Sequence, residues 1–130
     1  MEYQRTVHLD LPFAEAMSRT RDALAAHGFG ILTEIDMQAT LLAKRGTHID
    51  PYTILGACNP ALAEGALNVD PRIGVLLPCS VVVRSTGAEE CDVHVFEPDL
   101  IPAVSGIEAL TGYSDEAGAR LAGALADLAA

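Results

Sequence analysis

Apolar and polar residues recur along the chain with two different spacings, and these spacings predict its first elements. Residues 3–9 and residues 29–35 alternate between polar and apolar types, which is typical of half-buried β-strands. Between them, apolar residues recur three and four positions apart, which predicts an amphipathic helix. Asp10 is the expected N-cap of this helix, and Gly28 is expected to end it.

The same reasoning predicts two more helices around a central strand. Asp36 is the expected N-cap of a short helix that ends at Gly46. Residues 52–58 form an apolar run that predicts a strand. Asn59 and a following proline suit an N-cap and a first helical position, so a third helix is expected over residues 60–67.

The most hydrophobic stretch of the chain begins the second half. Residues 73–84 are rich in valine and leucine and predict a strand, in which Pro78 marks an edge or a bulge because it cannot donate a hydrogen bond. Residues 91–96 alternate after a turn at Thr86-Gly87, so a hairpin is expected over residues 73–96. A final amphipathic helix is predicted from about residue 114 to residue 129.

This order of elements predicts the fold class. We expect an α+β fold: one two-layer domain over residues 1–130, with a mixed β-sheet of about five strands covered by helices. The final helix is rich in alanine and has a narrow apolar face, which suits close packing against another helix. A homodimer is therefore the expected assembly.

Composition and charge narrow the class of protein. Half of the residues are apolar, which is too many for a disordered chain. The formal charge of −10 disfavours nucleic acid and anionic membrane surfaces as partners, since the positive charges are scattered. The chain shows neither a signal peptide nor an apolar stretch of membrane-spanning length, so a cytoplasmic protein is expected.

Two cysteines are the first candidates for chemistry. Cys58 lies just before the expected helix that Asn59 opens, where unpaired amides would lower the pKa of a thiol that points along the helix axis. If the strands that carry Cys58 and Cys79 are neighbours, the two sulfurs can bind a soft metal or form a reversible disulfide. The alternative is that both thiols only fill gaps in the core. Cys91, in an alternating strand, is interpreted as structural.

Other candidate groups are weaker. Glu34 and Asp36 share one face if the strand continues, and paired carboxylates can divide acid and base roles. The four histidines show no metal-ligand spacing and would have to be gathered from distant elements. The chain contains no G-x-S-x-G, P-loop or C-x-x-C motif, so the common hydrolase, kinase and thioredoxin interpretations are not supported.

Three ordered motifs carry a resemblance to a known family. They are Gly-Phe-Gly-Ile-Leu-Thr-Glu-Ile-Asp at 28–36, Tyr-Thr-Ile-Leu-Gly-Ala-Cys-Asn-Pro at 52–60 and Gly-Val-Leu-Leu-Pro-Cys-Ser-Val-Val-Val at 74–83. With them the chain resembles, over about residues 5–98, the domain of unknown function 302 family of small bacterial and archaeal proteins. The resemblance implies a compact α+β domain that is dimeric in some members, and it implies no settled activity. Ser80 and the Met37-Gln38 step depart from the usual family pattern.

Three functional hypotheses remain open. The first is a dimeric binding protein that holds a metal, a haem-like cofactor or a small ligand near Cys58 and Cys79, with Asn59, Glu34 and Asp36 as further candidates. The second is a thiol-dependent redox enzyme or sensor in which Cys58 reacts and Cys79 resolves it. The third is a structural dimeric module whose cysteines only pack. A protein without catalysis is the favoured interpretation, and the cofactor is not defined by the sequence.

Overall fold

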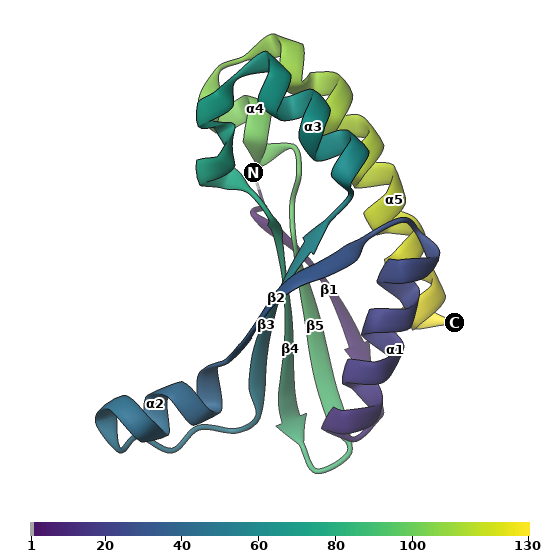
Figure 1. Cartoon of the computed structure of the whole chain (residues 1–130). Helices are drawn as coiled ribbons and strands as arrows, with labels where there is room; N and C mark the ends of the chain where they lie inside the picture. Colours follow the sequence, from purple (N-terminus) through teal and green to yellow (C-terminus); the bar gives the residue numbers. More distant parts are fainter. Residues whose placement is uncertain (1) are drawn as a thin grey trace.

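The structure, a computed structural model, describes residues 2–130 and is built on a five-stranded sheet (Figure 1). The strands are β1 (Gln4–Leu9), β2 (Gly30–Asp36), β3 (Tyr52–Cys58), β4 (Cys79–Gly87) and β5 (Glu90–Phe96). The helices are α1 (Phe13–Ala26), α2 (Met37–Arg45), α3 (Pro60–Val69), α4 (Leu100–Ser105) and α5 (Thr111–Ala129), with the 3-10 helices η1 (Pro71–Leu76) and η2 (Glu108–Leu110).

The sheet has the strand order β1-β5-β4-β3-β2, and every neighbouring pair is antiparallel. The α+β class is confirmed, whereas the expected mixed sheet is wrong. A helix between two strands is compatible with a parallel crossover, but the strands that flank α2 pair antiparallel with each other, and so do those that flank α3. Only the connection from β1 to β2, which contains α1, crosses from one edge of the sheet to the other.

One face of the sheet carries the core. Along β3, β4 and β5, alternate side chains point to this face, and all of these except Ser85, near the turn, are buried. Helices α1 and α5 contact each other and lie along this face (Figure 1). The buried residues of the sheet include Leu55, Val81, Val83, Val93 and Val95.

The opposite face is not covered by a helix layer, which agrees with the expected two-layer domain. The intervening side chains of β1, β4 and β5, such as Thr6, Ser80 and Val82, are exposed or half-buried. Helix α2 projects away from the rest of the fold (Figure 1), and none of its residues is buried. The fold therefore leaves a broad surface of the sheet accessible.

Three helix termini are those that the sequence predicts, and one differs. The Asp36 side chain accepts a hydrogen bond from the Ala39 amide, and the Asn59 side chain accepts one from the Leu62 amide, so both predicted caps are confirmed. Gly46 ends α2 in the left-handed region, with φ 65°. The predicted Asp10 cap is wrong, because α1 begins at Phe13 with Pro12 in the N-cap position and without a side-chain cap.

The predicted strand over residues 73–84 is also wrong in its first part. Residues 71–76 form η1, which Asp70 caps by accepting from the Arg72 amide, and β4 begins only at Cys79. Pro78 therefore lies before a central strand instead of marking an edge within it. The hairpin of β4 and β5 is confirmed, but its turn follows Gly87, since β4 extends to that residue.

The C-terminal part contains more helix than the sequence indicated. Helix α4 and η2 occupy the stretch marked by proline and glycine after Phe96, and α5 begins at Thr111. With α3 and η1 they bury a second small cluster that contains Ile73, Ile101 and Leu110. Among the residues that the structure describes, no helix is both long and apolar enough to cross a membrane.

Candidate functional site

The two predicted thiols lie on neighbouring strands. Cys58 is the last residue of β3 and Cys79 the first of β4, and these strands pair directly. The register places Ala57, not Cys58, opposite Cys79. All three cysteines are free, and Cys91, fully buried, donates to the Leu11 carbonyl at 3.4 Å, as expected for a structural thiol.

The environment of these thiols does not favour a thiolate. Burial raises the pKa of Cys58, whereas the sequence predicts a lowered pKa if the sulfur points along the helix axis. Burial also raises the pKa of Cys79, whose sulfur lies 3.9 Å from the Tyr113 hydroxyl. Since the thiolate is the nucleophile and the metal ligand, neither group is activated in this state.

The other predicted site residues have structural partners. Asp36 caps α2, and Glu34 forms an ion pair with Arg21 of α1 at 2.6 Å. Asn59 caps α3 and also donates to the Gly28 carbonyl at 3.0 Å. Each of the three side chains therefore has a partner within the fold.

The uncovered face of the sheet holds a polar network that crosses three strands. Arg84 of β4 donates from Nε to His94 Nε2 on β5 at 2.9 Å, so this ring nitrogen is an acceptor and carries no proton. His94 Nδ1 then carries the proton and donates to the Thr6 hydroxyl of β1 at 2.8 Å. Burial, together with the charge of Arg84, lowers the pKa of His94. Its ring is therefore held neutral and in one tautomer.

Asp92 continues this network toward the end of β1. Its Oδ2 accepts from Arg84 Nη2 at 3.2 Å, and its Oδ1 lies 2.6 Å from His8 Nδ1. The hydrogen bond to Asp92 is the main cause that raises the pKa of His8. The Asp92 carboxylate therefore forms hydrogen bonds with both the Arg84 guanidinium and the His8 imidazole.

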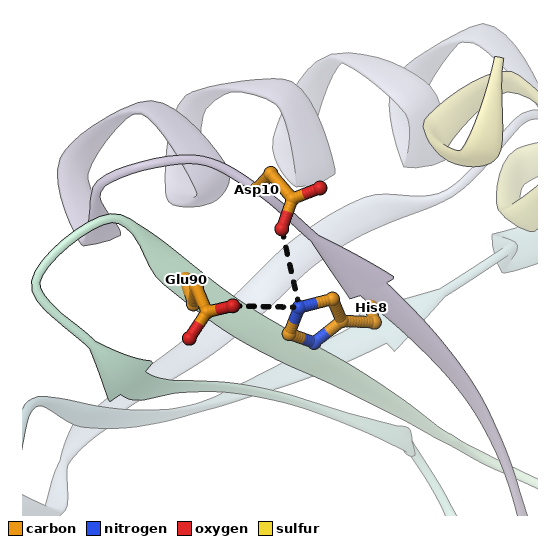
Figure 2. Close-up of side chains that lie close together, drawn as sticks. All are labelled: His8, Asp10 and Glu90. Carbon is orange, nitrogen blue, oxygen red and sulfur yellow. Dashed lines mark ion pairs between the residues drawn. The ribbon is translucent and has the colours of Figure 1, made fainter.

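The second nitrogen of His8 faces two more carboxylates (Figure 2). His8 Nε2 lies 3.4 Å from Asp10 and 3.6 Å from Glu90, and the three ligand atoms are within 4.8 Å of one another. Within residues 2–130 this is the only group of three or more histidine, cysteine or acidic side chains with such a spacing. All three residues are exposed, and neither predicted cysteine belongs to the group.

A hollow of about 430 Å³ lies on the same face, over β1, β3, β4 and β5. Its wall combines aromatic and apolar groups with one guanidinium and one imidazole, from Tyr3, Tyr52, Val82, Phe96, Arg84 and His94. Among the residues 2–130 that the structure describes, Arg84 is the only charged residue that lines the hollow. Volumes of this order accommodate small organic ligands.

The sequence analysis did not identify this surface. The alternation in residues 91–96 places Asp92, His94 and Phe96 on one face, which was the available signal, but it was used only to interpret Cys91. His8 and Asp10 have a two-residue spacing that is too common to indicate a site. Their meeting with Glu90 depends on the pairing of β1 with β5, which no local pattern reveals.

Together these features define a small α+β protein with an antiparallel sheet, a helix layer on one face and a polar, partly aromatic surface on the other. The profile of the family described as "Domain of unknown function DUF302" matches residues 4–128. The chain therefore belongs to the DUF302 family, as the three motifs predicted.

A solved structure agrees with this assignment. The crystal structure of an uncharacterised conserved DUF302 protein from Bacillus stearothermophilus superimposes with a TM-score of 0.89. It is 26% identical in sequence, and the match covers 98% of this chain and 99% of the other. No protein of curated function matches the chain. The family and the fold are thus established.

Proposed function

We propose that the protein is a small binding protein that holds an organic ligand in the hollow on the uncovered sheet face. The observation that carries this proposal is the hollow itself, where aromatic side chains and two fixed polar groups converge. Pockets for small molecules combine a mainly apolar wall with a few oriented polar groups. Here Tyr52, Val82 and Phe96 supply the wall, while Arg84 and His94 supply the polar groups.

The rigidity of the polar groups supports binding. His94 is held from both ring nitrogens, and Arg84 is held at two of its three nitrogens. A ligand would therefore meet Arg84 donors that His94 and Asp92 have already oriented, which lowers the entropy lost on binding. The strands that carry these groups, β4 and β5, are the two that form the sheet centre with β3.

An NMR titration with a phenylpropyl probe tests the proposal. 3-Phenylpropanamide, a neutral molecule, is added to the uniformly ¹⁵N-labelled protein, and amide shifts are followed. For a probe of this size a Kd of a few millimolar, about 5 mM, is expected. Shifts confined to the strands around Tyr52, Val82 and Phe96 are the expected result.

Two matched variants sharpen the test. Val82→Gln makes the hollow wall polar and should weaken binding at least about threefold. Val104→Gln makes the same change at an exposed position on α4, and should bind like the wild type. Shifts that are absent or scattered over the surface, for this amide and for its carboxylate analogue alike, would refute the proposal.

A cation at the group of His8, Asp10 and Glu90 is the second candidate function. Two ligands of a tetrahedral zinc ion lie about 3.3–3.6 Å apart, as follows from metal–ligand distances of about 2.0–2.2 Å. The distances of 3.4 and 3.6 Å at His8 Nε2 fit this geometry. In addition, Asp92 accepts from His8 Nδ1, as a carboxylate does when it orients a metal-binding imidazole.

Cobalt(II) provides a direct test of this second function. Tetrahedral binding should give visible absorption that His8→Gln abolishes and that His48→Gln, a change in an exposed loop, leaves intact. The expectation of a thiol site is tested in the same titration with Cys58→Ser. Loss of absorption in Cys58→Ser but not in His8→Gln would show that the metal binds at the cysteines and not at His8.

The redox alternative has less support. In this alternative Cys58 is the reactive thiol, but burial raises its pKa. The resolving thiol would be Cys79, which is buried. A sensor thiol is exposed and has a lowered pKa. We therefore favour binding over thiol chemistry as the function.

A further inference from the structure

We propose that the ligand of this hollow carries a carboxylate, which the outer edge of the Arg84 guanidinium binds, next to an apolar body. This inference rests on the proposed function and specifies the chemical class of the ligand. The cation group at His8 does not line the hollow, and Asp92 is the residue that contacts both His8 and Arg84.

The hydrogen bonds of Arg84 indicate which edge is free. Nε and Nη2 form one edge of the guanidinium, and both donate to residues of β5, namely His94 and Asp92. Among residues 2–130, no acceptor receives a hydrogen bond from Nη1. The edge formed by Nη1 and Nη2 therefore retains donors, and two parallel N–H groups of arginine match a carboxylate.

The charges around Arg84 also favour an anion. Arg84 is the only charged residue in the wall of the hollow as described for residues 2–130. The nearest acid, Asp92, is outside the wall, and its other oxygen is taken by His8. Asp92 thus interacts with both His8 and Arg84, so its negative charge does not fully neutralise the guanidinium of Arg84.

His94 acts as a positioning residue for this guanidinium. Its Nε2 accepts from Arg84 Nε, and its Nδ1 is tied to Thr6, so the ring cannot turn without losing both bonds. The Nε of Arg84 is thereby fixed by a neutral acceptor, while Asp92 fixes Nη2. Tyr52, Val82 and Phe96 then cover the apolar part of the ligand.

A matched pair of probes tests the inference separately from the proposed function. 3-Phenylpropanoate and 3-phenylpropanamide have the same shape and differ in charge. The carboxylate should bind at least about tenfold more tightly, because charge-assisted hydrogen bonds are the stronger ones. Amide shifts of the labelled protein again report the Kd and the location.

Variants identify the residue responsible. Arg84→Gln should reduce carboxylate binding to the level of the amide probe, so that the preference for the carboxylate disappears. Arg19→Gln, the same change on α1 at the other face of the sheet, should preserve the preference. His94→Asn should weaken the preference while the amide probe still binds, which a merely structural loss would not produce.

The outcomes are distinct. Equal affinities for the two probes, or a preference that survives Arg84→Gln, would overturn the carboxylate inference and leave the proposed function standing. If neither probe shifted the amides around the hollow, the proposed function would be overturned as well. A far-ultraviolet circular dichroism spectrum of each variant shows that the sheet is retained.

Discussion

At the scale of single residues, His8 and His94 occupy neighbouring strands in opposite electrostatic environments. Asp92 raises the pKa of His8, whereas burial and Arg84 lower the pKa of His94. We predict that His8 titrates above the ordinary value of about 6.5 and His94 below it. Imidazole proton shifts followed by NMR between pH 4.5 and pH 8.5 measure both values.

Single substitutions assign the two curves. Asp92→Asn should lower the pKa of His8, and Arg84→Gln should raise that of His94. For stability the signs also differ: His8 contributes stability below its unfolded pKa that is lost as the pH rises through its folded pKa, whereas His94 costs stability as the pH falls below about 6.5. A higher pKa at His94 than at His8 would contradict the network described above.

Gly56 of β3 is a residue whose identity follows from close packing. A Cβ at this position would lie 2.3 Å from the Thr33 hydroxyl oxygen and 2.9 Å from Pro78 Cγ. We predict that Gly56→Ala lowers the free energy of unfolding by about 1–3 kcal/mol. Urea denaturation measures the change.

The matched control for this substitution lies in α3. Gly65→Ala places a Cβ in open space within a helix, and should raise the free energy of unfolding by about 0.5–1 kcal/mol. If Gly56→Ala were as stable as the wild type, Thr33 and Pro78 would have to be able to move apart.

At the scale of elements, Asn59 connects the end of β3 to α3. Its side chain caps the helix through the Leu62 amide and holds the Gly28 carbonyl at the end of the turn after α1. We predict that Asn59→Ala costs about 1–2 kcal/mol in the free energy of unfolding. Asn68→Ala, inside α3 and exposed, should change it by less than about 0.5 kcal/mol in the same denaturation experiment.

Elements with local signals were predicted well from the sequence. The bounds of β3 and the caps at Asp36 and Asn59 depend on residues within a few positions of one another. The errors arose where a local pattern had two interpretations. Valine and leucine around Ile73 suit a strand, but Asp70 and Pro71 open a 3-10 helix there, and the strand begins only after Pro78.

The candidate site was less predictable for a physical reason. Arg84, His94, Thr6 and Asp92 meet because β5 pairs with both β1 and β4, and β1 is about ninety positions away from its partner in sequence. Alternation indicates which side chains share a face, but not which face the helices leave uncovered. Cys58 and Cys79 were visible as motif residues, yet burial and register determine their chemistry.

At the scale of the whole molecule, one edge of the sheet exposes apolar groups. All but one of the seven residues of the edge strand β2 are exposed, including Leu32 and Ile35 at 63% and 45%. The adjoining α2 buries none of its residues and exposes 47% of Leu42. Exposed edge strands readily pair with another chain.

We therefore predict a homodimer that joins through β2 and α2, away from the hollow. Light scattering after gel filtration should give twice the chain mass of 13.6 kDa. Changing Ile35 and Leu42 to glutamate together should give the single-chain mass, because two buried charges on each copy would face each other across the contact. Val104→Glu, at an exposed position on α4, should leave the dimer intact. A wild-type protein with the single-chain mass of 13.6 kDa at micromolar concentration would refute this assembly.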